Sequence, residues 1–285
     1  MHSLAFRKFK KEMGQANHFL ITILVGLDAV KDGAQKCPGF QTVWAPKSVA
    51  ASVSRSRHYV IKSALAWAVD NLDMYLRLCN RMPRLYGEEE SLDIADTKHS
   101  VFLKLMVVLR RHAELPIGQA AYVDLLICWR NRLVHFDAEN QLSTPTQRYF
   151  RNIPASDSVI SKYHLDVDEM LKHFTKMECP TFKEITTLIS MTIHFVETLD
   201  HILLDQVDQY QFLTQTLSWL LKQDETALGV FSHRNTTPLK RQKRLKQLFV
   251  TNGIPEDFYN ADGQKFIEDI SSLTAEGFLA KIAAD

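Results

Sequence analysis

The scarcity of glycine and proline is the feature that most constrains how this chain can fold. Only 10 glycines and 9 prolines occur among 285 residues. Tight turns depend on these two residue types, so their scarcity disfavours an all-β protein with many turns and favours long helices joined by short connections. Residues 3–31 and 57–81 also repeat apolar side chains at helical spacing. We therefore predict an all-α fold.

Further helices are expected downstream. The predicted segments are residues 96–112, a helix from about 119 to the motif described below, 162–175, and a long stretch over 181–222 that is broken or kinked within its length. The polar connection over 137–158 is predicted to be a surface loop, because it is long and rich in polar residues. Composition shifts near 232–238, so we predict a helical domain over 1–232 and a small extension over 233–285 that is first basic and then acidic.

Bulk charge and cysteine content exclude several classes of protein. The net charge is +1, so no global field would hold the chain on nucleic acid or on an acidic membrane, and such binding would need a local patch. The four cysteines, Cys37, Cys79, Cys128 and Cys179, form no CxxC pair, which argues against both a zinc site and a disulfide framework. The Gly-rich loops that hold ATP or dinucleotides are absent too. We expect a reduced, cytoplasmic chain without metal or cofactor.

The N-terminus has roughly the order of a secretory signal, with the basic "FRKFKKEM" followed by the apolar "FLITILVGL". The apolar run is too short to span a membrane, and Asp28 and Lys31 close it. No small-residue cleavage site follows. We therefore predict a buried first helix and no membrane partner.

The stretch "RNRLVH" at 130–135 combines groups that carry chemistry at the end of an apolar helix. Arg130 and His135 would point about 140° apart on an ideal helix, so they can meet only where the helix ends or distorts. Asn131 shares a face with His135, and its amide can orient the imidazole. A histidine can deprotonate a ribose 2′-OH, and an arginine can stabilise charge on the attacked phosphate. These parts are sufficient for metal-independent RNA cleavage.

This motif resembles the R-x4-6-H motif of the HEPN superfamily (higher eukaryotes and prokaryotes nucleotide-binding), including the polar residue after the arginine. The resemblance implies a HEPN-like helical bundle and an endoribonuclease of toxin or phage-defence systems that acts on single-stranded or loop RNA. Arg130 and His135 would be the catalytic pair and Asn131 a supporting residue. It also implies a homodimer in which two motifs face each other across one cleft, and an antitoxin or regulatory protein is a further expected partner.

Three other interpretations stay open. Arg and His also occur at ordinary helix C-termini, where they favour the macrodipole. The chain could instead be a non-catalytic HEPN-like module that binds RNA or protein, or a scaffold in which Arg130 pairs with Asp137 or Glu139. Asp70 and Asp73 could place an acidic group near the motif, as some members of the superfamily do, but we expect a solvated helix face there.

A basic run near the C-terminus is the densest positive cluster of the chain. We predict that it contacts the RNA backbone together with Arg132 of the motif, which would add affinity without sequence preference. The alternative is a solvated amphipathic helix with Leu239, Leu245, Leu248 and Phe249 on its inner side. The basic residues are Lys240, Arg241, Lys243, Arg244 and Lys246.

Overall fold

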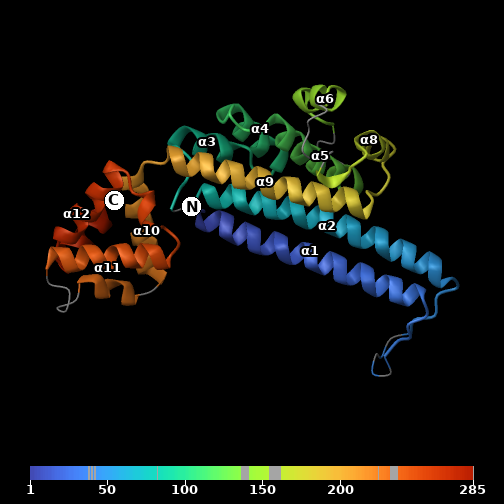
Figure 1. The fold of residues 1–285 in the computed structure, drawn as a ribbon, viewed down its shortest axis with the longest axis horizontal. Coiled ribbons are helices and arrows are strands. Elements are labelled where there is room, and N and C mark those ends of the chain that lie inside the picture. Colours follow the sequence, from blue (N-terminus) through green and yellow to red (C-terminus); the bar gives the residue numbers. More distant parts are fainter. Residues whose placement is uncertain are drawn as a thin grey trace. The chain divides into compact units, whose positions relative to one another are not determined.

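The fold is all-α, as predicted (Figure 1). The computed structural model describes residues 1–285 except 38, 40, 42, 82, 136–140, 154–161, 224, 232–236 and 285. No strand occurs within these described residues. The chain divides into two compact units, which we treat separately. The motif unit comprises residues 8–74 and 99–196, and the terminal unit comprises 1–7, 75–98 and 197–285.

The motif unit is built around a helix that is buried on all sides. α5 (Ile117–Val134) is the helix that leads into the RNRLVH motif. Each residue from Ala120 to Trp129 is at most 2 % exposed. The other helices that contribute to this unit are α1 (Leu4–Lys31), α2 (Val49–Cys79), α4 (Val101–Arg111), α6 (Thr144–Arg151), α8 (Val167–Thr175) and α9 (Phe182–Gln206).

The predicted loop over 137–158 is wrong for residues 144–151, which form α6. The side chain of Ser143 accepts a hydrogen bond from Thr146 N, and Pro145 occupies the first turn, where a missing N–H costs nothing. α6 packs on α5, and Phe150 meets the ring of Tyr122 edge-on at 5.3 Å. The segment was predicted to be a loop because it is polar. It forms a helix nevertheless, since only a narrow side of that helix is buried.

Three other helix boundaries differ from the prediction, and one of them is that of α8, which begins at Val167 rather than near residue 162. α2 begins at Val49 rather than near residue 57, because its first turns carry small and polar residues that leave no apolar stripe to detect. The helix predicted over 96–112 begins only at Val101, where the Ser100 side chain accepts from Leu103 N. A separate helix, α3 (Glu88–Asp96), precedes it. The break predicted within 181–222 is confirmed, since α9 ends at Gln206 and α10 (Gln209–Gln223) follows.

The terminal unit gathers short helices around α10. They are the 3-10 helices η1 (Glu225–Phe231) and η3 (Glu256–Phe258) and the α-helices α11 (Pro238–Thr251), α12 (Ala261–Ser272) and α13 (Ala275–Ala284). α12 contacts both α10 and α11, and η1 also contacts both. The predicted boundary near residue 232 does not coincide with the division of the structure, because residues on both sides of it pack into this one unit.

A buried carboxylate holds the N-terminus of α1 inside the terminal unit. Asp200 is fully buried and accepts hydrogen bonds from the backbone N–H of Ser3 at 2.9 Å and from its hydroxyl. Tyr75 donates a third at 3.2 Å. Burial raises the pKa of Asp200, and these hydrogen bonds oppose that shift. Ser3 in turn accepts from Phe6 N, so it caps α1 while it is bound to α9.

The first helix is buried only in part. Phe6, Phe9 and Met13 are fully buried, as the prediction requires, whereas Phe19 and Val25 are 57 % and 63 % exposed. Among the described residues, α1 is the one helix whose length and composition would also suit a membrane span, and 17 % of its most apolar window is buried.

Candidate functional site

The end of α5 places Arg130 and His135 in different backbone conformations. The helix runs to Val134, and His135 is extended, with φ −126° and ψ 116°. His135 N still donates to Asn131 O at 2.9 Å. The helix therefore ends between the two proposed catalytic residues, which is the condition under which their side chains can approach each other. Their convergence stays a prediction.

The three motif residues differ in exposure. His135 is exposed, Arg130 is partly buried and Asn131 is 4 % exposed. An exposed imidazole is accessible to a polynucleotide, and the partly buried guanidinium is accessible in part. The expected hydrogen bond between the Asn131 amide and the His135 imidazole stays a prediction.

Two carboxylates of α2 lie close enough to the Arg130 guanidinium to influence its pKa. Burial lowers the pKa of Arg130, while the charges of Asp70 and Asp73 act in the opposite direction. Negative charge nearby favours the charged form of the arginine. The alternative partners Asp137 and Glu139 lie outside the described residues.

The expectation of a solvated face is wrong for Asp73. Its carboxylate lies 2.7 Å from Lys104 Nζ of α4, and the two side chains are 16 % and 3 % exposed. Asp70, by contrast, is exposed. Asp70 and Asp73 therefore place acidic groups near the motif, which was the less favoured of the two interpretations. Of the two, Asp73 belongs to a buried ion pair. Lys104 was not identified from the sequence, although a lysine within the apolar run "VFLKLMVVL" was a usable signal.

Arg132 does not face solvent as an RNA contact would. Its Nη1 donates to Phe174 O at 3.1 Å, near the end of α8, and its guanidinium lies 3.9 Å from the centre of the Phe174 ring. A cation at a helix C-terminus and over an aromatic ring has a structural role. Trp129 contacts the same region, because its Nε1 donates to Glu178 O at 3.0 Å. These contacts fasten the last turns of α5 to α8 and to the segment that follows it.

A second buried carboxylate, on α5, binds the segment that follows the motif. Asp124 is fully buried, and its Oδ2 accepts from Ser143 N at 2.9 Å. The Cys128 thiol lies 3.3 Å from both Asp124 Oδ1 and Gln141 O. The segment that follows His135 is thus attached to α5 again within eight residues. A single carboxylate inside the apolar run "AAYVDLLICW" was the signal that sequence reasoning missed.

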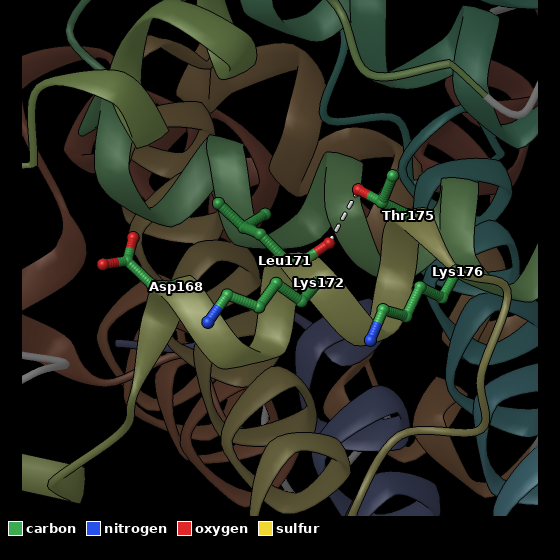
Figure 2. A pocket seen from close by; sticks show the side chains of 5 residues that line it. All are labelled: Asp168, Leu171, Lys172, Thr175 and Lys176. Atoms are coloured by element: carbon green, nitrogen blue, oxygen red, sulfur yellow. Dashed lines mark hydrogen bonds between the residues drawn. The ribbon is translucent and has the colours of Figure 1, made fainter.

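A shallow hollow of about 260 Å³ lies on α8 (Figure 2). Its lining residues are Asp168, Leu171, Lys172, Thr175 and Lys176. Lys172 is paired with Glu169 at 3.0 Å, and Thr175 donates to Leu171 O at 2.8 Å. None of these residues belongs to the motif, so the hollow adds no enclosed substrate pocket to it.

The basic run lies on α11 in the terminal unit. Two of its five residues contact other parts of this unit, and the other three are exposed. Arg241 donates to Ser271 O at 2.7 Å, and Lys246 lies 5.7 Å from the centre of the Tyr259 ring. Lys240, Lys243 and Arg244 are exposed and share one face by their spacing. On the apolar side, Leu245 and Phe249 are buried, but Leu239 is 75 % exposed and does not belong to the inner side that was predicted.

Comparison of the chain with protein-family models, with curated proteins and with solved structures gives no match. Within the described residues, no group of three or more His, Cys, Asp or Glu side chains is arranged to hold a metal ion. The case for a function therefore depends on the geometry at the end of α5.

Proposed function

We propose that the chain is a metal-independent endoribonuclease of HEPN type, with single-stranded or loop RNA as its substrate. The observation that carries this proposal is that α5 ends between a partly buried Arg130 and an exposed His135. His135 acts as the general base that removes the proton of a ribose 2′-OH. Arg130 stabilises the negative charge that develops on the phosphate, and the nucleophile comes from the substrate.

The surroundings of Arg130 support this assignment. The negative charges of Asp70 and Asp73 favour the charged form of the guanidinium, and its planar set of N–H donors suits a phosphate. Asn131, at the same helix end, is the proposed supporting residue, and a homodimer and a regulatory protein partner remain part of the proposal.

The purified chain is expected to cut RNA in EDTA and to leave 2′,3′-cyclic phosphate and 5′-hydroxyl ends. Attack by the adjacent 2′-OH forms the cyclic phosphate and releases the 5′-oxygen, and no metal takes part. The measurement is gel analysis of end-labelled RNA, with phosphatase treatment to identify the ends. Cleavage that stops in EDTA, or products with 3′-hydroxyl ends, would contradict the mechanism.

Exposed cations on α11 are expected to contact the RNA backbone. Replacing Lys240, Lys243 and Arg244 together by alanine should lower RNA affinity and reduce the slope of log K against log salt by about 2, since each phosphate contact on a single strand contributes about 0.7. Fluorescence anisotropy between low and high salt measures this slope. Lys265→Ala, at an exposed lysine of α12, is the control. An unchanged slope for the triple variant would show that α11 does not contact RNA and is a solvated amphipathic helix.

A second function is favoured by the same surroundings of Arg130. A guanidinium that is partly buried next to two carboxylates also suits a non-catalytic helical module, in which Arg130 holds α5 against α2. This module would bind RNA or protein without cutting it. RNA binding that persists without any cleavage would favour it over the enzyme.

A further inference from the structure

Lys104 is a buried lysine of the motif unit that the cleavage mechanism does not use. It interrupts the apolar run "VFLKLMVVL" of α4, and its side chain is 3 % exposed. Its Nζ donates to the Asp73 carboxylate on α2 at 2.7 Å. The charge of Asp73 also acts on Arg130 of α5, and α4 packs on that helix. A buried ion pair therefore lies within electrostatic reach of the motif.

Stability alone does not account for a lysine at this position. Taking an ammonium and a carboxylate out of water costs about as much free energy as their attraction returns, and an apolar pair of similar volume is often at least as stable. The neighbours of Lys104 on the buried side of α4 are Val101, Leu105 and Val108, so an apolar side chain would suit the site. The charge of Lys104 is more readily explained by its effect on the groups around it.

Arg130 lacks a partner for its guanidinium. Among the described residues, no ion pair reaches this partly buried side chain, and its buried Nε has no hydrogen-bond partner. The two carboxylates whose charges act on it, Asp70 and Asp73, are near but not paired with it. An arginine without a carboxylate partner keeps its planar pair of N–H donors for another anion of matching shape, such as a phosphate.

The ion pair accounts for the fact that Asp73 does not occupy Arg130. The ammonium of Lys104 offsets the charge of this carboxylate, and both groups are largely withdrawn from water, so water screens their attraction only weakly. Asp70 is exposed, and water screens its charge. Asp73 is therefore the stronger competitor of a phosphate for Arg130, and Lys104 is the group that holds it back.

We propose that Lys104 is a positioning residue of the motif, which binds Asp73 and thereby leaves Arg130 to bind the phosphate of the RNA. Lys104 is too deeply buried to touch the substrate itself, so it acts only through Asp73. This role rests on the function proposed above for Arg130.

Binding of an RNA that cannot be cut tests the proposal without relying on cleavage. RNA with 2′-O-methyl groups lacks the nucleophile, and its affinity is measured by fluorescence anisotropy. Lys104→Met removes the charge at similar length and is expected to weaken binding about tenfold, because Asp73 then pairs with Arg130 in place of the phosphate. Lys104→Arg keeps the charge and is expected to retain the affinity. Equal affinity of Lys104→Met and the unaltered chain would overturn the proposal.

A double variant separates the effect on Arg130 from a loss of structure. Lys104→Met with Asp73→Leu leaves no buried charge, so it is expected to fold and to bind within about twofold of the unaltered chain. Lys104→Met with Asp70→Asn should stay weak, because Asp73 is still present. In an Arg130→Ala chain, Lys104→Met should change the affinity by less than about twofold, since the group it acts on is gone. A tenfold loss in the first double variant, or equal weakening with and without Arg130, would show that Lys104 acts in another way.

Failure of this role and failure of the proposed function give different results. If Arg130→Ala binds the uncut RNA as tightly as the unaltered chain does, and the unaltered chain cuts no RNA, the function proposed for Arg130 is wrong and the role of Lys104 falls with it. If Arg130→Ala weakens binding and Lys104→Met does not, Arg130 binds phosphate without help from Lys104, and only the positioning role is wrong.

Discussion

Replacement of His135 by alanine is expected to lower RNA cleavage by about 10²- to 10⁴-fold, the usual contribution of a general base. Because His135 is exposed and lies outside the helix, its loss removes no packing. The thermal midpoint should therefore stay unchanged while activity falls. Single-turnover cleavage of labelled RNA in EDTA, together with circular dichroism melting of the same samples, separates the two effects.

Two further variants give this test its controls. His99→Ala removes another exposed histidine of the motif unit and should leave cleavage unchanged. Arg130→Lys keeps the positive charge but loses the planar pair of donors, so it should lower the cleavage rate more than it weakens RNA binding. Equal cleavage by His135→Ala and the unaltered chain would exclude the imidazole as the base. The motif would then be an ordinary helix terminus.

Replacement of Asp73 by alanine is expected to lower the free energy of unfolding by about 3–5 kcal/mol, because it leaves a buried ammonium without its partner. Lys104 is 3 % exposed and lies 2.7 Å from the Asp73 carboxylate. The loss should appear as a lower midpoint in urea unfolding followed by circular dichroism, at any pH where the carboxylate of the unaltered chain is ionised.

Comparison with two other variants shows whether the effect comes from the unpaired charge. Asp70→Ala removes the exposed neighbouring carboxylate and should change stability by less than about 0.5 kcal/mol. The double variant Asp73→Leu with Lys104→Met replaces both charges by apolar groups and should recover most of the loss. If Asp73→Ala were as stable as Asp70→Ala, the ion pair would contribute nothing.

The parts of the fold that could be predicted are those where one apolar stripe repeats over many turns. The helices from Leu4 and from Ile117 were located to within about two residues. Periodicity succeeds there because burial extends over several turns. It failed for α6, whose eight residues bury only Thr146 and Phe150 and whose remaining side chains are polar. A short helix on the surface of another helix leaves too few apolar positions to form a pattern.

The candidate site was predictable where it depends on the local sequence. The helix end next to His135 follows from residues within one turn. The positions of Asp73 and Arg132 do not, because each depends on a distant segment. Asp73 lies near Arg130 although 57 residues separate them, and Arg132 contacts Phe174, which is 42 residues away. Single-sequence patterns carry no information about which helices become neighbours.

The burial of α5 separates two kinds of evolutionary constraint within one helix. Ten successive residues from Ala120 to Trp129 admit almost no change of volume, since each contacts the interior on every side. Val134 and His135 are exposed at the end of that helix and can be exchanged without repacking anything. Single substitutions at the end of α5 could therefore remove or alter the activity while the buried part of the helix stays unchanged. Active and inactive descendants would then share the same interior.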